Sequence, residues 1–523
     1  MPPALSAMML LKIALATSLV QGSDSVDILI RRGTVHDGSG TPGRITDVGV
    51  RADRIVFVGD AVQARVLARR TIDARGLIVA PGFIDPHNHL LANLPDVNPQ
   101  VRRAEAALMQ GITTMTMGPD GRGPFDVARV MAESERAGIG TNVFTLVGFG
   151  DVRGNVMGNS AAKATPAQVD SMRKLIDKAM REGAYGVGSG LFYAPQSYST
   201  TDEVISVISA AKPYGGVYDT HQRDESSYTI GLLNSVREAI RIGRESGLTT
   251  NLGHVKALGV DVWGYADSVI RLMREARAGG HMVVADQYPW TASGTGLSAA
   301  LLPRWVQSGG RDSMQARMGD PSQRERILSE MRDNLRRRGG DSTLLLINGG
   351  AAARPFIGKT LKQAAAEKGM PAVETALEMI RNGLDMGVAS FNMTERDIET
   401  FMKDPFVMTS SDGSGGHPRL YGTYPRKIRN YVLDKPVITM ERMVQASSRQ
   451  VAEVYGIRER GSITVGNFAD VIVFDPATIR EQATYVEPTR LSVGMRWVLV
   501  NGQLAVSDGQ PTGVLAGRGL RQR

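Results

Sequence analysis

A pair of histidines at the end of an apolar segment is the strongest chemical feature of the sequence. His87 and His89 end the run PGFIDPHNH. Because side chains alternate between the two faces of an extended strand, both imidazoles point to the same side. Two imidazoles at one strand end are well placed to bind a divalent metal ion. A lone His-x-His pair is common by chance, but this chain has only seven histidines, so the pair predicts a metal site.

Four further polar residues each follow a short apolar stretch in the same way. They are Asp120, His221, His254 and Asp412. Taken singly, each has an ordinary structural explanation, a capped turn for an aspartate or a buried imidazole for a histidine. Together they repeat one pattern. If the apolar stretches are parallel barrel strands, their C-terminal ends share one rim, and these side chains become neighbours of the histidine pair.

The elements that would position these residues follow from the hydrophobic pattern. Short apolar strands alternate with helical stretches, which is typical of βα units. Eight strands are predicted, the number that closes a TIM (β/α)8 barrel, and the barrel domain is expected over residues 81–459. Residues 297–397 do not fit the repeat and predict an insertion before the last strand. The predicted strands are 77–85, 113–117, 142–147, 186–191, 217–220, 249–252, 282–286 and 406–410, and the predicted helices include 101–110, 166–182, 201–211 and 235–246.

Both ends of the chain show short strands separated by Gly and Asp turns. We expect residues 23–80 and 460–523 to assemble into one small β-sandwich domain. Residues 1–22 contain an apolar run with a single lysine, too short to span a membrane, followed by a small residue. This pattern predicts a signal peptide and a periplasmic or secreted protein, with a plain N-terminal extension in a cytoplasmic protein as the alternative.

Composition limits the chemistry further. The 523 residues carry a formal net charge of +8 and include no cysteine. Disulfides, thiolate nucleophiles and cysteine-bound metals are therefore excluded, and a metal must use imidazole, carboxylate or water. The densest basic segment, residues 324–338, has helical spacing and predicts a solvated helix face rather than a nucleic-acid-binding surface. Beyond the leader, no stretch is long enough for stable membrane insertion.

Longer motifs carry a family resemblance. The sequence resembles the N-acyl-D-amino-acid deacylases, or D-aminoacylases, of the amidohydrolase superfamily. PGFIDPHNH marks only the superfamily, whereas GLFYAPQSYSTTDE, THQRDE and HPRLYGTYPR are far more specific to the deacylases. With GITTMTMG, LVGFGDVRGNVMG and GSITVGNFADVIVFD, the resemblance covers nearly all of the chain after the leader.

The resemblance implies a role for each candidate residue. It implies Zn²⁺, as one or two ions, with other divalent metals as alternatives. It implies that Asp412 is the general base and acid. Lys256 and Tyr288 match positions that touch the substrate, Tyr193 matches a tyrosine beside it, and Arg419 is a candidate for gripping a substrate carboxylate. The implied metal ligands are His87, His89, His221 and His254.

The sequence departs from the family at two places near the site. The family usually has Asn-Cys-Gly where this chain has Pro119-Asp120-Gly121. Asp120 replaces a thiolate ligand by a carboxylate that can bridge two metals, which favours a two-metal site. The family's Gly-His-Gly turn has Phe149 here, which leaves the substrate preference open. The strand at 186–191 lacks the lysine that hydantoinases and dihydroorotases carbamylate, which argues against a cyclic-amide substrate.

The sequence therefore predicts metal-dependent hydrolysis of N-acyl-D-amino acids to a carboxylate and a free D-amino acid. The main alternative is a related metal amidase for dipeptides or N-acyl aromatic amides, because Phe149 and Trp290 are candidates for an apolar pocket. A non-catalytic scaffold is disfavoured, since every expected ligand position holds a competent residue. The expected partner is a small-molecule amide, with no nucleic acid, and the oligomeric state is not fixed by the sequence.

Overall fold

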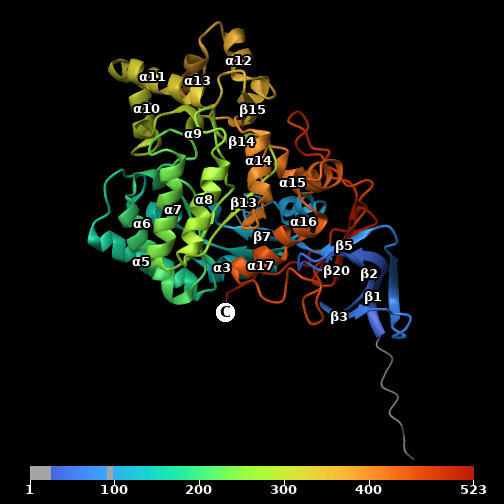
Figure 1. Cartoon of the computed structure of the whole chain (residues 1–523). Helices are drawn as coiled ribbons and strands as arrows, with labels where there is room; N and C mark the ends of the chain where they lie inside the picture. The colour runs from blue at the N-terminus through green and yellow to red at the C-terminus, as the bar shows by residue number, and fades with distance from the viewer. Residues whose placement is uncertain (1–24, 91–97, 523) are drawn as a thin grey trace, which may run out of the picture.

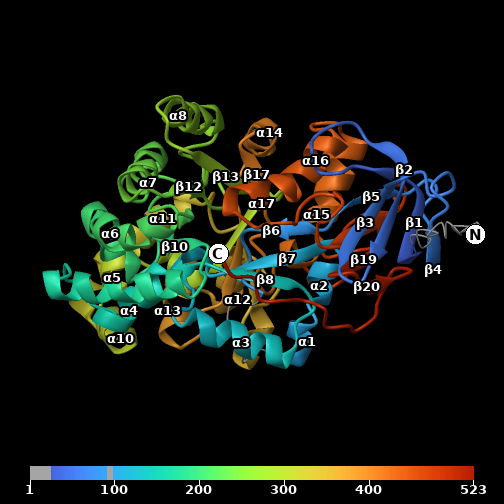
Figure 2. The same ribbon diagram turned by 90° about the horizontal axis from the view of Figure 1, so that it is seen from below.

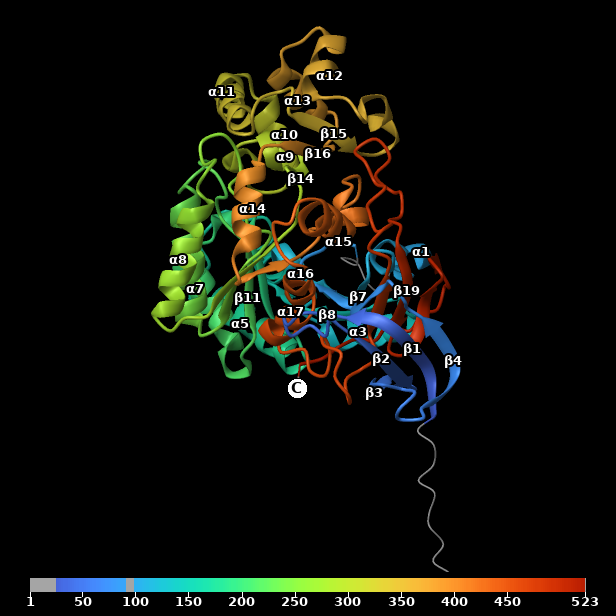
Figure 3. The ribbon, with the colours of Figure 1, turned by 45° about the vertical axis from the view of Figure 1, so that its right-hand side comes forward.

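The computed structural model describes residues 25–90 and 98–522. The predicted signal peptide at residues 1–22 lies outside these ranges. Among the described helices, none has both the length and the apolar character needed to cross a membrane. The chain forms a central α/β part, an inserted unit at the top of Figure 1, and a β-rich part at one side to which both chain ends contribute (Figures 1 and 3).

Parallel strands form the centre of the molecule. One sheet has the order β6-β7-β8, and the other has the order β9-β10-β11-β12-β13-β17. Only Leu146 separates β8 from β9, and Asn88 after β6 forms a parallel bridge with Gly413 after β17. The two sheets are thus linked at both ends. Each of the eight predicted strands overlaps a strand of the structure, but the predicted strand 77–85 is divided into β5 (Ile78–Pro81), which joins the sheet of the chain ends, and β6, and the predicted strand 142–147 is divided into β8 and β9. Their bounds are β6 Phe83–Asp85, β7 Ile112–Met117, β8 Asn142–Thr145, β9 Val147–Gly148, β10 Gly186–Gly190, β11 Val217–His221, β12 Thr249–Leu252, β13 Val283–Gln287 and β17 Val407–Thr409.

Helices between these strands cover the outside of the parallel sheets (Figure 2). Their ends follow local sequence rules. In α5, Thr165 and Gln168 form a capping box and Pro166 occupies the first turn, where no amide donor is needed. In α7, Gly247 ends the helix in the left-handed conformation. The bounds are α3 Val127–Ala137, α4 Phe149–Met157, α5 Pro166–Arg181, α6 Thr201–Ile208, α7 Leu232–Ser246, α8 Ala266–Ala278, α14 Glu395–Lys403, α15 Arg419–Ile428, α16 Met440–Ser447 and α17 Arg449–Tyr455.

Two predicted helices differ from the observed ones. The segment 101–110 forms two short helices, α1 Pro99–Arg102 and α2 Glu105–Leu108, because Ala104 between them has a φ of 53°. The segment 201–211 is helical only to Ile208 and continues as a 3-10 turn containing Pro213. Proline has no backbone N–H to donate, so an α-helix cannot continue through it without losing a hydrogen bond.

The inserted unit has its own sheet and its own apolar core. Its three strands are antiparallel in the order β14-β16-β15, and the core includes Met331, Leu346 and Leu377. The unit spans residues 292–391, so it begins and ends slightly earlier than the predicted insertion at 297–397. The arginine-rich segment forms α11, as its periodicity predicts. The bounds are β14 Ala292–Gly296, α9 Leu297–Leu301, α10 Arg311–Gly319, α11 Pro321–Arg337, β15 Leu344–Asn348, α12 Leu361–Lys368, α13 Ala372–Arg381 and β16 Gly387–Phe391.

Both chain ends join one nine-stranded sheet. Its order is β21-β20-β19-β18-β5-β1-β2-β3, with β4 pairing to β1. The ends meet where β5 lies antiparallel to β18, with Val79 opposite Val473. The two ends therefore share one sheet, while its arrangement as a sandwich stays a prediction. The bounds are β1 Ser25–Val35, β2 Arg44–Arg51, β3 Arg54–Gly59, β4 Leu67–Asp73, β5 Ile78–Pro81, β18 Val471–Phe474, β19 Met495–Val500, β20 Gln503–Ser507 and β21 Gln510–Pro511.

Candidate metal centre

The six residues predicted to form the metal site all lie at the C-terminal ends of the parallel strands. This common edge brings together side chains that are up to 325 positions apart in the sequence, from position 87 to position 412. The residues are His87 and His89 after β6, Asp120 after β7, His221 at the last position of β11, His254 after β12 and Asp412 after β17.

Three of these residues have a backbone conformation that favours glycine. The φ angles are 56° at Asp120, 36° at His254 and 45° at Asp412. A non-glycine residue in this region costs about 1–3 kcal/mol, and such residues concentrate at functional sites. Each of the three lies where the chain turns away from a strand end, so the turn directs its side chain to the shared edge.

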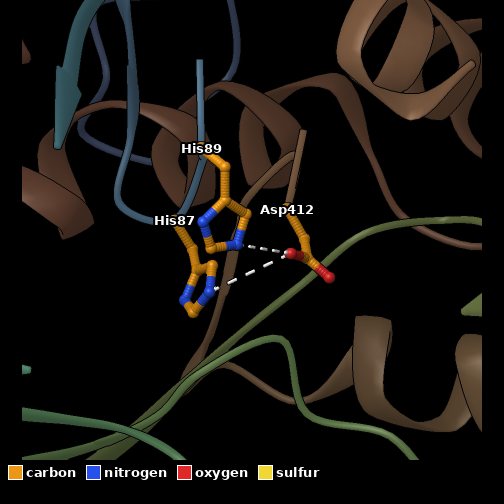
Figure 4. Close-up of side chains that lie close together, drawn as sticks. All are labelled: His87, His89 and Asp412. Atoms are coloured by element: carbon orange, nitrogen blue, oxygen red, sulfur yellow. Dashed lines mark ion pairs between the residues drawn. The ribbon is translucent and has the colours of Figure 1, made fainter. Parts of the chain in front are cut away.

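His87, His89 and Asp412 form one group of candidate ligands (Figure 4). Nε2 of His89 lies 3.3 Å from Oδ1 of Asp412, and Nε2 of His87 lies 4.0 Å from the same oxygen. One ligand atom from each residue lies within 4.8 Å of the others. The two histidines thus face the same side, as the alternation along an extended segment predicts.

Asp120 lies at the centre of the cluster. Its Oδ1 is 3.3 Å from His87 Nε2, 3.4 Å from His254 Nε2 and 3.7 Å from His221 Nδ1. Its Oδ2 is 3.6 Å from His89 Nε2. One carboxylate therefore faces all four imidazoles.

The buried donor and acceptor atoms of this cluster fit a divalent cation. Oδ1 of Asp120, Nε2 of His87 and Nδ1 of His221 are buried and have no hydrogen-bond partner among the described residues. Leaving such atoms unsatisfied is costly. Imidazole nitrogen and carboxylate oxygen are common ligands of Zn²⁺ and related ions, so a bound metal would satisfy them.

Burial and charge together set the ionisation of the cluster. Burial favours a raised pKa for Asp120 and Asp412, but the histidines, and Arg419 in the case of Asp412, hold both pKa values well below the usual range. Burial favours a lowered pKa for His87 and His254, but nearby carboxylates raise these values to about 10 and about 9. Since imidazole must be neutral to bind a metal, a cation would take the place of these protons.

Glu225 is a site residue that the sequence analysis missed. Its Oε1 lies 3.2 Å from His254 Nδ1 and 2.7 Å from Lys256 Nζ, and its Oε2 lies 3.6 Å from His221 Nε2. Burial acts to raise the pKa of Glu225, but Lys256 and both histidines hold it well below the usual range. The carboxylate thus orients two candidate ligands from behind. Its position four residues after His221, within the motif THQRDE, could have indicated that Glu225 lies near the metal site.

Two buried acids on the strands, Asp219 and Asp286, were also missed. Asp219 Oδ1 lies 3.8 Å from His87 Nδ1, and Asn251 donates to both acids at 2.6 Å. Asp286 accepts the backbone N–H of His254 at 2.8 Å. Burial raises the pKa of Asp219 to about 6. An acid inside an apolar strand needs a partner, and here the partners include residues that position the imidazoles.

The cluster opens into a cavity of about 430 Å³. The four residues predicted to contact the substrate, Tyr193, Lys256, Tyr288 and Arg419, all line it. Arg419 Nη1 lies 2.7 Å from Asp412 Oδ2, and its guanidinium lies 4.8 Å from the ring centre of Tyr288. This volume lies in the range of small-molecule sites, about 300–1,000 Å³.

The predicted apolar pocket of Phe149 and Trp290 is wrong. Phe149 is fully buried in the main core, and Trp290 is buried against Tyr288 and Met393. Neither residue lines the cavity. Phe149 begins α4, and its side chain packs into the core between helices and strands. An aromatic residue type alone does not show whether the side chain faces a cavity or the core. The aromatic lining comes instead from Phe192, Tyr193, Tyr228 and Tyr288.

Four imidazoles and two carboxylates at the C-terminal edge of parallel strands, beside a cavity, define a metal-dependent hydrolase by their chemistry. The model of the amidohydrolase family matches residues 70–506. The chain belongs to this family, which confirms the superfamily predicted from PGFIDPHNH.

Individual relatives agree with this assignment. A D-aminoacylase of Alcaligenes xylosoxydans xylosoxydans is 30% identical, covering 95% of this chain and 98% of the relative. A solved D-aminoacylase, described by its binuclear metal centre, superposes with a TM-score of 0.80 at 30% identity and covers 95% and 100% of the two chains. An N-acyl-D-glutamate deacylase of Bordetella bronchiseptica, solved with zinc and a phosphonate inhibitor, gives 0.79 at 28% identity with the same coverage.

Proposed function

We propose that this chain hydrolyses the amide bond of N-acyl-D-amino acids, releasing a carboxylate and a free D-amino acid. The observation that carries the proposal is the cluster in which Asp120 faces four imidazoles with Asp412 beside them, at the base of a small-molecule cavity. Similarity to D-aminoacylase and to N-acyl-D-glutamate deacylase supports the substrate class.

The fold and the location of the protein are part of this proposal. The parallel strands would close as a (β/α)8 barrel, which the bridge between Asn88 and Gly413 supports. Residues 1–22 would direct export to the periplasm or out of the cell, which their apolar run supports.

Two ligand groups are proposed within the cluster. His87 and His89 would hold one ion, and His221 and His254 a second. Asp120 faces both groups and is the proposed bridge. Zinc is the proposed metal, because imidazole and carboxylate suit it and a relative was solved with it. A bound ion supplies Lewis acidity, which activates water for attack and stabilises the charge that develops on the amide oxygen.

Asp412 is the proposed proton carrier. Its low pKa keeps the carboxylate ionised and able to accept a proton. Arg419 Nη1 binds Oδ2, while Oδ1 faces His89. The ion pair fixes the plane of the carboxylate, so that Oδ1 takes the proton of the attacking water and returns it to the leaving amine nitrogen.

Arg419 and Tyr288 are proposed to bind the α-carboxylate of the substrate. Nε of Arg419 and the hydroxyl of Tyr288 are buried and have no hydrogen-bond partner among the described residues. Both residues line the cavity beside Asp412, so one guanidinium edge holds the catalytic carboxylate and another donor remains for the substrate. Tyr193, whose ring centre lies 4.7 Å from that of His221, is proposed to contact the amide oxygen.

The proposed function is tested with protein whose metal content has been measured. The purified enzyme is incubated with N-acetyl-D-methionine, its L enantiomer, N-acetyl-D-glutamate and a dipeptide, and amine release is followed before and after chelation. We expect hydrolysis of D substrates that chelation abolishes and zinc restores. Absence of D-substrate hydrolysis in zinc-loaded protein, or preference for the dipeptide, contradicts the proposal.

A further inference from the structure

The inserted unit contributes a buried arginine to the cavity. Arg338 follows the last turn of α11, lines the cavity, and is only 2% exposed. Its Nη1 donates to Ser390 Oγ at 3.1 Å, and its Nε is buried without a hydrogen-bond partner. Within residues 25–90 and 98–522, no carboxylate forms an ion pair with Arg338. Arginine is rarely buried without an anionic partner, because removing its charge from water is costly.

The surroundings of Arg338 add donors and positive charge. Its guanidinium lies 5.8 Å from the ring centre of Tyr228, whose hydroxyl is also buried without a partner. Arg304 lies 3.9 Å from the ring centre of Phe192, in the same aromatic wall. Burial lowers the pKa of Arg304 to about 10, and repulsion from Arg338 contributes. An anion would satisfy the open donors and relieve this repulsion.

Arg338 differs from Lys256 and Arg419, the other two buried cations of the cavity, in having no acid beside it. Lys256 pairs with Glu225 at 2.7 Å, and Arg419 pairs with Asp412 at 2.7 Å, so both belong to the wall that holds the metal ligands. The contacts of Arg338 are instead with Ser390 and Tyr228. The α-carboxylate is attached to the carbon that bears the scissile nitrogen, so it must lie beside the metal ligands. An anion at Arg338 lies further along the substrate.

We propose that Arg338, assisted by the hydroxyl of Tyr228, binds a carboxylate on the side chain of the amino acid, so that the preferred substrates are N-acyl derivatives of acidic D-amino acids. This inference rests on the proposed function and narrows it. Identity alone does not choose this class, because a D-aminoacylase and an N-acyl-D-glutamate deacylase match the chain at 30% and 28%. The buried, unpaired guanidinium of Arg338 is the feature that favours an acidic side chain on the substrate.

The test compares substrates that differ in one charge. Values of kcat/KM are measured for N-acetyl-D-glutamate and N-acetyl-D-glutamine with wild type, Arg338→Gln, Arg338→Lys and Arg332→Gln. Arg332 is the matched control, since it lies on the same helix with a 51% exposed side chain. N-succinyl-D-methionine and N-acetyl-D-methionine are compared to place the anion on the acyl group or on the side chain. Circular dichroism checks that each variant folds.

We expect wild type and Arg332→Gln to prefer the glutamate substrate by about 10- to 100-fold, the range for losing one hydrogen-bonded charge. Arg338→Gln should remove this preference, and Arg338→Lys should keep part of it. Equal kcat/KM for glutamate and glutamine substrates in wild type overturns the proposal. An unchanged preference in Arg338→Gln, or a preference for the succinyl substrate that Arg338→Gln removes, also overturns it.

A binding measurement separates this inference from the proposed function. If no N-acyl-D-amino acid is hydrolysed, the proposed function fails, and the anion subsite is judged by thermal shift alone. N-acetyl-D-glutamate should then raise the Tm of wild type more than N-acetyl-D-glutamine does, and the difference should vanish in Arg338→Gln. If Arg338→Gln does not fold, Arg338→Lys is used instead. A difference between the Tm shifts with N-acetyl-D-glutamate and N-acetyl-D-glutamine that is as large in Arg338→Lys as in wild type contradicts a role for the guanidinium.

Discussion

Replacing Asp412 separates proton transfer from metal binding and from stability. A general base contributes about 10²- to 10⁴-fold, so Asp412→Asn should lower kcat by that factor, about 3–5 kcal/mol of activation free energy. The amide keeps an oxygen facing Arg419, which is 1% exposed, but it removes the negative charge of the ion pair. Asp412→Ala removes this acceptor as well and leaves a buried guanidinium unpaired. Relative to wild type, that change should lower the free energy of unfolding by ~3–5 kcal/mol.

The assay combines three measurements on wild type, Asp412→Asn and Asp412→Ala. They are kcat on N-acetyl-D-methionine, metal per chain, and urea unfolding. We expect both variants to lose activity, Asp412→Asn to keep the metal bound by His221 and His254, and both variants to lose stability, Asp412→Ala more than Asp412→Asn. Near wild-type kcat in metal-loaded Asp412→Asn refutes the assignment of the proton carrier. Wild-type stability in both variants refutes the importance of the ion pair with Arg419.

Three further predictions concern the groups around the site. Asp120→Asn removes the charge that faces four imidazoles, so metal per chain by atomic absorption should fall; wild-type content would show that Asp120 is not a ligand. Glu225→Gln loses the ion pair with Lys256, so metal affinity in chelator competition should fall about 10- to 100-fold, whereas the exposed control Glu245→Gln should bind normally. Burial lowers the pKa of Lys427 from 10.5 to about 7, so the unfolded state binds more protons between these pH values, and stability should rise with pH there by up to ~5 kcal/mol. In urea unfolding, Lys427→Met should lose this rise, and an unchanged pH profile would contradict it.

The sequence was sufficient to predict the parallel strands and the polar residues that meet at their ends. A short apolar run flanked by polar residues specifies a buried strand, and a shared edge follows from the parallel arrangement. The sequence pattern therefore predicts that His87 and His89 lie beside His221 and His254. The repetition of the pattern carried this inference, since each residue alone was ambiguous.

Other parts of the site depend on tertiary packing and could not be predicted in this way. The inserted unit has antiparallel strands and helices whose packing against one another is not encoded by one hydrophobic period. Arg338 looked like one more charge on a solvated helix face, yet it is buried at the end of α11. The pocket predicted from Phe149 was wrong because the direction of its side chain is set by tertiary packing and cannot be inferred from the residue type. The spacing of Glu225 from His221 was visible in the sequence, but its contacts with His254 and Lys256 are seen only in the structure.

The most direct test of the central claim is a crystal structure of the zinc-loaded protein with anomalous diffraction at the zinc edge. We predict zinc at the cluster, at about 2.0–2.2 Å from His221, His254 and Asp120, with any second ion bound by His87 and His89. If protein recovered from the crystals is active but the crystal structure shows no zinc at these residues, the account is contradicted.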